Sequence, residues 1–212
     1  MRIIDQEQWP RRAIYEHYQG EDWPFYAMSF PVDVTELKAY TKRRGLSFYY
    51  AMIFLVTKAM EEVENFRLRD RKGTIVLHDR LVPSFTDMAP GEELFHITTL
   101  EAGEDLAAFC QAAREKSRAQ TAFLEEEGPW EADELVYFSS EPWLPMTSVT
   151  HDRNFDPADC IPRAAWGRYE EQNGRLRLSL AIDVNHRMVD GIHVGRFYEA
   201  LNRRIAALAE EP

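Results

Sequence analysis

Two strand-like segments joined by Asn173-Gly174 constrain the fold of this chain more than any other feature of its sequence. Residues 164–172 and 175–185, on either side of this dipeptide, are its clearest strand candidates. Asn and Gly both tolerate positive φ, which a tight two-residue hairpin turn requires. The sequence therefore predicts an antiparallel hairpin whose second strand ends at residue 185.

A polar turn and an amphipathic helix follow this hairpin. The turn contains the pattern His-x-x-x-Asp-Gly at residues 186–191. Apolar residues then recur at steps of three and four, which predicts a helix with one buried face. These residues are Val194, Phe197, Leu201, Ile205 and Leu208. A histidine at the end of a buried strand thus lies on rigid scaffold beside an opening, where a general base is expected.

Helix and strand patterns are interleaved along the rest of the chain. Residues 9–12 are predicted to lead into a short helix that runs through Tyr18. Further helices are predicted from a cap at Asp33 or Thr35 until just before Gly45, at 48–64 after a Ser47 cap, and at 104–124. Strands are predicted at 25–30, 74–77, 82–87, 94–100, 135–139 and 144–149. Helix 48–64 is apolar on most faces and should be the central buried helix.

This order predicts an α+β fold, a two-layer sandwich whose mixed or largely antiparallel sheet has helices packed on one face. No linker rich in Gly, Ser or Pro interrupts the chain, so residues 1–212 are expected to form a single domain. A hydrophobic content of 45% indicates a packed globular protein.

The charge balance and the cysteines limit the possible partners. Lys and Arg number 25 against 36 Asp and Glu, a net charge of −11, which argues against non-specific binding to nucleic acid or to anionic membranes. Cys110 and Cys160 lack metal-ligand spacing, and we expect both to be reduced in a cytoplasmic protein. The N-terminus does not resemble a secretory signal, the apolar run at 48–56 is too short to span a membrane, and residues 125–129 are expected to form a solvated, charged loop.

The residues of the turn leave several interpretations open. His186 fits a general base that removes a proton from a hydroxyl or thiol, and it fits equally a structural histidine in a turn. Asp190 fits a carboxylate that orients the imidazole, and it also fits a helix N-cap. His193 completes a helical spacing typical of metal ligands, but Gly191 interrupts the segment and the chain has no second ligand cluster. The absence of a Gly-x-Ser-x-Gly elbow disfavours a serine hydrolase.

Residues 185–197, Asn-His-Arg-Met-Val-Asp-Gly-Ile-His-Val-Gly-Arg-Phe, resemble the active-site motif His-His-x-x-x-Asp-Gly-Phe-His-Val of the chloramphenicol acetyltransferase family. Dihydrolipoyl acyltransferases share the shorter His-x-x-x-Asp-Gly. Further similarity to the family covers nearly the whole chain. It lies in Trp-x-Arg-Arg-x-x-Tyr-x-x-Tyr at 9–18, in Asp-Val-Thr-x-Leu-Lys at 33–38, in Pro-x-Phe-Thr at 83–86 with Phe95, and in Pro142-Trp143 with Thr147-Ser148.

The resemblance implies an acetyl-CoA-dependent O-acetyltransferase that acts on chloramphenicol or a similar small hydroxylated acceptor. His186 would be the general base, and the Ser148 hydroxyl would stabilise the oxyanion, a contribution of about 2.7–4 kcal/mol for one such donor. Asp190 would pair with Arg11 and hold the shape of the site. No metal is implied, and antibiotic resistance is the expected role.

The resemblance also implies ligand contacts and an assembly. Tyr169 and Arg168 correspond to positions that contact the adenine and the phosphate of CoA. Tyr18, Tyr26 and Phe95 correspond to walls of the acceptor pocket, although ordinary core packing is an alternative for these rings. The family forms homotrimers with active sites at the subunit interfaces, and the same assembly is expected here.

Three departures from the family pattern keep other functions open. Asn185 replaces the first histidine of the motif, and Ala165 replaces a threonine that helps to hold a water near the transition state. Residues 22–24, Asp-Trp-Pro, do not resemble the acceptor-side loop of the family. The alternatives are therefore an acyltransferase with another acceptor or acyl donor, and a catalytically silent trimer that binds a small aromatic ligand.

Overall fold

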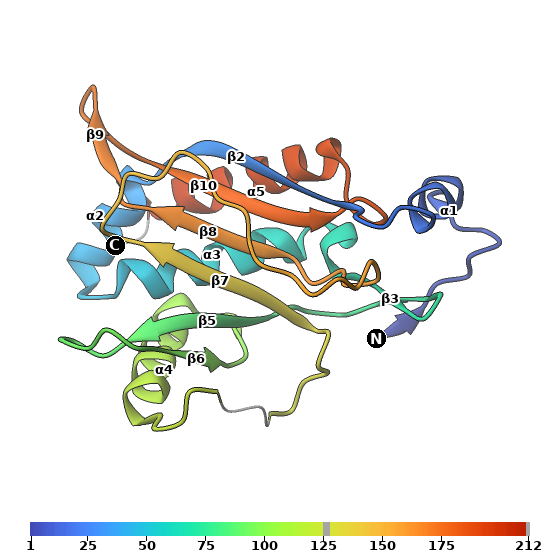
Figure 1. Cartoon of the computed structure of the whole chain (residues 1–212). Coiled ribbons are helices and arrows are strands. Elements are labelled where there is room, and N and C mark those ends of the chain that lie inside the picture. Colours follow the sequence, from blue (N-terminus) through green and yellow to red (C-terminus); the bar gives the residue numbers. More distant parts are fainter. Residues whose placement is uncertain (125–127, 211–212) are drawn as a thin grey trace.

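The computed structural model describes residues 1–124 and 128–210, which form a mixed β-sheet with helices on one face (Figure 1). The large sheet has seven strands within these residues. They are β2 (Phe25–Asp33), β5 (Val82–Met88), β6 (Phe95–Thr99), β7 (Leu135–Glu141), β8 (Arg163–Gly167), β9 (Glu170–Gln172) and β10 (Arg175–Asn185). A smaller sheet contains β1 (Arg2–Ile3), β3 (Leu68–Arg71) and β4 (Thr74–Leu77).

The strand order places the end of β10 beside the start of β2. The order is β2-β10-β8-β7-β5-β6, with β9 paired to the other end of β10. The pairs β5–β7 and β7–β8 are parallel, and the remaining pairs of this sheet are antiparallel. Asn185 lies opposite Phe25 in the register, so the turn after β10 meets the segment that enters β2.

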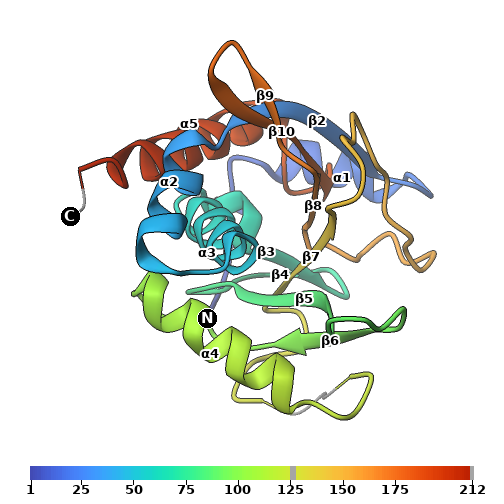
Figure 2. The same ribbon diagram turned by 90° about the vertical axis from the view of Figure 1, so that its left-hand side faces the viewer.

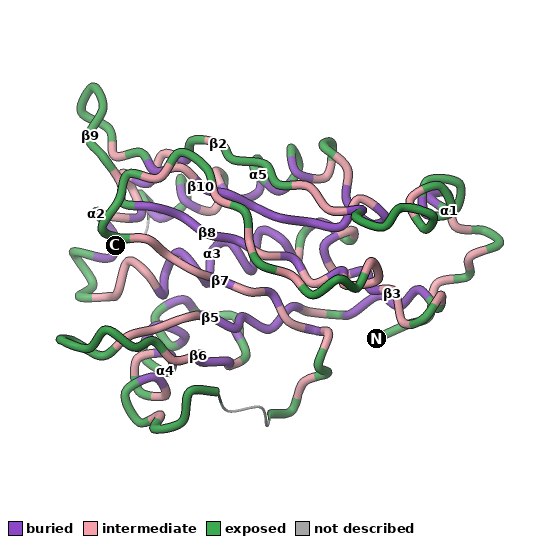
Figure 3. The backbone as a smooth tube through the Cα atoms, viewed as in Figure 1, coloured by how far each residue is buried: buried purple, intermediate pink, exposed green. Residues whose placement is uncertain are grey.

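The helices cover one face of the sheet, as Figure 2 shows. They are α2 (Thr35–Arg44), α3 (Phe48–Glu61), α4 (Leu106–Ala119) and α5 (Gly191–Ala207), whereas α1 (Arg12–Gln19) lies beyond the end of β10 (Figure 1). The side chains from Tyr50 to Met60 of α3 are all buried, which confirms that this helix is central. Buried segments also run along β8 and β10 (Figure 3). The predicted α+β architecture with one helical layer is therefore confirmed.

The hairpin turn follows the sequence prediction closely. Asn173 and Gly174 have φ of 54° and 75°, the left-handed conformation that the dipeptide suggested. The first predicted strand is split into β8 and β9, because the Arg168 N–H turns away from the ladder to donate to Leu144 O at 2.7 Å.

The strand predicted at 144–149 is wrong, and this segment is an irregular loop. Its backbone groups bond within a turn: Leu144 N–H donates to Glu141 O, and Met146 N–H donates to Leu144 O. The loop lies so close to β8 that a methyl group at Gly167 would come within 2.5 Å of the Met146 nitrogen. Glycine at this position therefore lets the segment between β7 and β8 cross the open face of the sheet.

Other element boundaries also differ from the predictions. The helix predicted at 104–124 ends at Ala119, because the chain then turns back along β6 and Phe123 O accepts the Ile97 N–H. The helix predicted at 48–64 ends at Glu61 and is followed by the 3₁₀ turn η1 (Glu64–Arg67). Strand β3 was not predicted. Residues 125–127 of the predicted charged loop lie outside the described residues.

Candidate active site

His186 follows the last residue of β10 and lies between two tyrosine rings. The Tyr18 ring is nearly parallel to the imidazole, with centroids 4.4 Å apart and planes inclined by 12°. The Tyr26 ring lies 4.6 Å away at 46°. The His186 side chain is 33% exposed, but its Nδ1 is buried and has no hydrogen-bond partner. The exposure therefore belongs to other atoms of this side chain, and the ring remains open to a substrate.

Arg11, just before α1, binds the backbone of the turn that carries the imidazole. Its Nη2 donates to His186 O at 2.8 Å, and its Nε donates to Arg187 O at 2.7 Å. The same guanidinium binds both carboxylate oxygens of Asp190. One planar side chain thus satisfies two carbonyl groups and one carboxylate at the start of α5, which suits the fork geometry of arginine.

Other segments hold the remaining backbone groups of the turn. The His186 N–H donates to Pro24 O at 2.7 Å. Burial raises the pKa of Tyr26 to about 12, so its hydroxyl stays protonated and donates to Val189 O. Asn65 Nδ2 donates to Met188 O at 2.7 Å. Because buried backbone groups are costly to leave unpaired, these bonds make the turn a rigid platform.

Asp190 lies beside the imidazole and is bound by Arg11. The hydrogen bond from Arg11 lowers the pKa of Asp190, although partial burial opposes this effect. Its Oδ1 lies 3.1 Å from His186 Nδ1, outside hydrogen-bonding geometry. Both carboxylate oxygens bind Arg11, and Asp190 is also the N-cap of α5. The lowered pKa favours the ionised carboxylate.

His193 closes the first turn of α5. Its Nδ1 accepts the Asp190 N–H at 2.8 Å, while the His193 N–H donates to Asp190 O at 2.9 Å. Burial and the nearby charge of Arg11 lower the pKa of His193, which favours the neutral ring that this acceptor role requires. Among residues 1–124 and 128–210, no three His, Cys, Asp or Glu side chains are grouped so that they would hold a metal ion.

The structure does not bring Ser148 to His186 within one chain. Ser148 is exposed in the loop after β7, and the adjacent Thr147 O accepts a hydrogen bond from Ser179 of β10 at 2.9 Å. From Ser179 to Asn185 the strand advances about 20 Å at roughly 3.3 Å per residue. The serine therefore lies beside the middle of β10, about 20 Å along the strand from the histidine.

Phe95 also lies apart from Tyr18 and Tyr26. It begins β6 at the far edge of the sheet, is half-exposed, and contacts Phe123 with ring centroids 5.5 Å apart. Strands β8, β7 and β5 separate β10 from β6, a distance of about 19 Å at ~4.8 Å per strand. The three aromatic residues expected in one pocket thus occupy two separate places on a single chain.

Arg168 lines a groove of about 280 Å³ between the ends of β2 and β10 and the loop that carries Ser148. Tyr169 packs beside the core at this end of the sheet, with its ring 5.3 Å from that of Phe48 and the Lys38 ammonium 5.3 Å from its centroid. Arg168 has no ion pair with another described residue. Arg177 and Glu170 also line this groove, so the charged side chains among its described lining residues are two arginines and one carboxylate.

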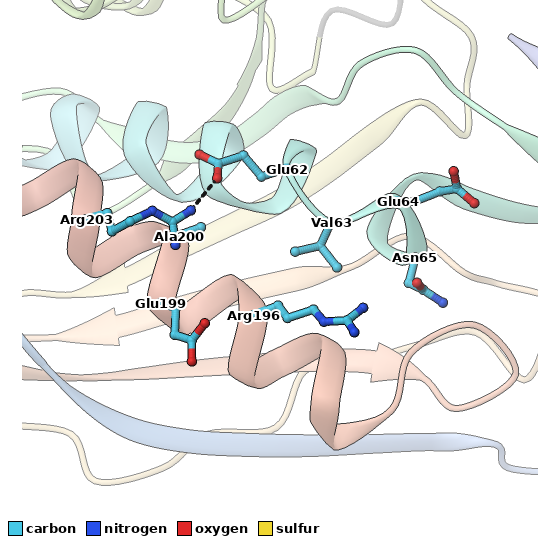
Figure 4. Close-up of a pocket in the computed structure, with 8 residues that line it drawn as sticks. All are labelled: Glu62, Val63, Glu64, Asn65, Arg196, Glu199, Ala200 and Arg203. Atoms are coloured by element: carbon cyan, nitrogen blue, oxygen red, sulfur yellow. Dashed lines mark hydrogen bonds and ion pairs between the residues drawn. The ribbon is translucent and has the colours of Figure 1, made fainter.

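A second cavity, of about 380 Å³, lies between α5 and the junction of α3 with η1 (Figure 4). Its walls include Arg196 and an ion pair between Arg203 and Glu62 at 2.7 Å. None of the residues expected to be catalytic or to bind substrate lines it.

Comparison with known proteins identifies the family. Residues 1–202 match the family model described as chloramphenicol acetyltransferase. The chain belongs to the chloramphenicol acetyltransferase family. The chloramphenicol acetyltransferase of Streptomyces acrimycini is 30% identical over 208 residues, which are 96% of this chain and 93% of that protein. One from Clostridium perfringens is 28% identical over 200 residues, covering 92% and 90% of the two chains.

Solved structures agree with this family membership. A chloramphenicol acetyltransferase matches with a TM-score of 0.85 and 25% identity, covering 96% of this chain and 99% of that one. The cubic core of a pyruvate dehydrogenase complex matches with a TM-score of 0.68 and 18% identity, over 93% and 88% of the chains, and shares the fold alone. As a member of the chloramphenicol acetyltransferase family, the protein is an acyltransferase. None of the helices in its described part is long and apolar enough to cross a membrane.

Asn185, which departs from the family motif, has a structural role that the sequence did not reveal. Its Nδ2 donates to Pro157 O at 2.9 Å and to Asp159 O at 3.1 Å, and its Oδ1 accepts the Arg187 N–H at 2.9 Å. These partners lie in an irregular loop and in the turn itself, so no periodic pattern could have indicated them. Ala165 is buried on β8 opposite Ala181, and it offers no hydroxyl there.

The sequence likewise did not indicate that Arg153 lies beside the end of β10. Its side chain is fully buried and forms ion pairs with Asp183 at 2.8 Å and with Asp159 at 2.9 Å. The Phe25 ring lies 4.3 Å from its guanidinium. The surrounding sequence is that of a polar loop, so burial of this arginine had no local signal. Arg153 anchors the segment between β7 and β8 beside the end of β10.

Proposed function

We propose that this protein transfers the acetyl group of acetyl-CoA to a hydroxyl group of chloramphenicol or a similar small acceptor, with His186 as the general base. The observation that carries the proposal is the half-open imidazole, which two tyrosine rings enclose on a turn braced by Arg11. A base held in this way meets the geometric requirement for removing a proton from a bound hydroxyl.

The proposed reaction begins at the Nε2 atom of neutral His186, since Nδ1 is buried against Asp190. Nε2 takes the acceptor's hydroxyl proton as the oxygen attacks the thioester carbonyl. The tetrahedral oxyanion accepts a hydrogen bond from the Ser148 hydroxyl. Collapse breaks the carbon–sulfur bond, the CoA thiolate takes the proton back from the imidazolium, and an acetyl ester and CoA are released. Asp190 does not relay the proton because His186 Nδ1 makes no hydrogen bond to it.

The proposed active site is shared between copies of the chain in a homotrimer. His186 of one copy would meet Ser148 and Phe95 of a second copy, because neither residue is near His186 in its own chain. Exposed apolar side chains in the loop after β7, Trp143 and Leu144, support burial against a second copy.

Acetyl-CoA would lie in the groove lined by Arg168. A guanidinium that has no carboxylate partner among the described residues suits a CoA phosphate. The half-buried ring of Tyr169, which packs against Phe48 and Lys38, would be available to the adenine. In cells, the proposed setting is the cytoplasm, which is consistent with the two buried free thiols Cys110 and Cys160. Acetylation of chloramphenicol there would give resistance to this antibiotic.

A different acceptor is the second candidate, and Trp23 favours it. This half-exposed ring contacts Phe155 with centroids 5.6 Å apart and Phe25 at 5.0 Å. The next residue, Pro24, accepts the His186 N–H. The aromatic cluster is therefore connected to the base and would favour an acceptor with a large apolar part.

The experiment is a thiol-release assay with purified protein, acetyl-CoA and a panel of hydroxylated acceptors that includes chloramphenicol. The wild type and Arg12→Met, which removes an exposed arginine that pairs with Glu16, should release CoA in proportion to acceptor consumed. His186→Ala should fall to background. The proposal fails if no acceptor supports CoA release or if His186→Ala retains the wild-type rate, and the preferred acceptor decides between the two candidates.

A further inference from the structure

We propose that Arg187 is a positioning residue for acetyl transfer, which fixes the end of α1 so that the Tyr18 ring holds the His186 imidazole in its working orientation. This inference rests on the proposed function of His186. It assigns a role to the buried arginine that follows the base in the sequence.

The Arg187 side chain binds the last carbonyl groups of α1. Its Nε donates to Tyr18 O at 3.2 Å, and its Nη2 donates to Gln19 O at 3.1 Å. The Tyr18 carbonyl also accepts the Glu21 N–H at 3.2 Å just beyond the helix. Both carbonyls lie at the negative end of the helix dipole, so a buried guanidinium is well suited to them. Arg187 thus ties the residue that stacks on His186 to the turn that carries His186.

Asp70 of β3 holds the other side of the guanidinium. Its Oδ2 lies 3.2 Å from Arg187 Nη1, and the two side chains are only 6% and 3% exposed. The Tyr15 hydroxyl of α1 donates to the same oxygen at 2.9 Å, while the Gly73 N–H donates to Oδ1 at 2.7 Å. Asp70 therefore keeps Arg187 in place and adds a second attachment for α1.

The imidazole depends on its aromatic neighbours because hydrogen bonds do not fix its plane. Arg11 and Pro24 bind the backbone of His186, but Nδ1 has no hydrogen bond. Rotation of the ring is limited by the stacked Tyr18 on one side and by Tyr26 on the other. Since Arg187 sets the position of the Tyr18 backbone, it acts on the base through that ring.

The test is a double-mutant cycle between Arg187→Met and Tyr18→Leu, measured as kcat and KM. Each single variant should lose about 10- to 100-fold in kcat, the effect expected for a misplaced catalytic group. The KM for acetyl-CoA should stay within about threefold, since neither residue lies in the groove of Arg168. The double variant should be no more than about threefold slower than the slower single variant, because both substitutions remove the same support of the His186 ring by Tyr18.

Arg187→Lys and Arg12→Met complete the series. Lysine retains the charge but lacks the planar set of N–H donors of a guanidinium, so Arg187→Lys should be intermediate in kcat. It can replace Arg187→Met in the double-mutant cycle if that variant does not fold. Arg12 is exposed on the same helix and pairs only with Glu16 among the described residues, so Arg12→Met should match the wild type. Circular dichroism and thermal melting report whether each variant is folded.

Nuclear magnetic resonance of the His186 ring gives a readout independent of turnover. The ring shifts should change in Arg187→Lys and in Tyr18→Leu but not in Arg12→Met. Additive losses in the cycle, or an unchanged kcat and unchanged ring shifts in Tyr18→Leu, would overturn the positioning role. If the wild type transfers no acetyl group, or if His186→Ala remains active, the proposed function fails instead, while the ring shifts still test the contact.

Discussion

Arg11 and Asp190 form a bidentate ion pair that closes the turn carrying His186. The guanidinium is almost fully buried, and it reaches the turn from the opposite end of the chain. Its remaining N–H groups bind the carbonyls of His186 and Arg187. The pair therefore fixes the backbone from which the imidazole projects.

Replacing Arg11 by lysine should destabilise the protein although the charge is kept. Lysine cannot bind the carboxylate and the two carbonyls together, so we expect a loss of about 1.5–3 kcal/mol in the free energy of unfolding, the range for hydrogen bonds to a charged group. Urea denaturation measures the change. The exposed Arg12→Lys should differ from the wild type by less than about 0.5 kcal/mol. Equal stability of the two variants would show that Arg11 does not brace the turn.

The contribution of Asp190 to stability should depend on pH in one direction. Arg11 lowers the pKa of Asp190 in the folded state, so the ionised carboxylate stabilises the fold above the ordinary carboxyl pKa of ~3.9. This contribution is lost as the pH falls through the lower pKa of the folded state. The difference in unfolding free energy between the wild type and Asp190→Asn should thus be constant from about pH 5 to 7 and shrink below about pH 4. A difference that grows on acidification would contradict the ion pair.

Ser148→Ala should reduce turnover without weakening acetyl-CoA binding. If the hydroxyl stabilises the oxyanion, kcat should fall by about 10²- to 10³-fold, as for loss of one such donor, while KM for acetyl-CoA changes little. Ser179→Ala removes only the hydrogen bond to Thr147 O, so its loss of kcat should be smaller. Steady-state kinetics of both variants are the measurement. A Ser148→Ala enzyme with full kcat would exclude the proposed role.

Arg168→Met should act on acetyl-CoA binding instead. Loss of a charged donor to a phosphate is expected to raise KM for acetyl-CoA about tenfold with kcat nearly unchanged. The matched change Arg196→Met lies in the cavity of Figure 4, away from the groove, and should leave KM unaltered. If the two variants behave alike, the groove lined by Arg168 does not bind the CoA phosphate.

Local patterns predicted those parts of the molecule that depend on neighbouring residues. Asn173-Gly174 forms the expected turn because these two residues themselves tolerate positive φ. The regular spacing of apolar residues after Gly191 forms α5 as expected. The prediction of a strand at 144–149 was wrong. The path of this loop is determined by its close approach to Gly167 rather than by its own apolar residues.

Contacts between residues far apart in the chain could not be predicted from the sequence. Arg187 pairs with Asp70, and Arg153 pairs with Asp183, and in each case an arginine in a polar stretch is buried by residues far away in the chain. Motif similarity suggested His186, Asp190 and Arg11, which the fold brings together. It could not indicate that Ser148 and Phe95 lie about 20 Å from His186 in the same chain. The loop packing beside Ser179 sets the first separation, and the strand order sets the second.

The most direct test of the account is complementation between His186→Ala and Ser148→Ala. Each variant alone should be nearly inactive in the thiol-release assay. If every active site combines His186 of one copy with Ser148 of another, random mixing of equal amounts during refolding should give about a quarter of the sites both wild-type residues. The predicted result is therefore recovery of about a quarter of wild-type activity. Activity no greater than the sum of the two variants would contradict a site shared between copies.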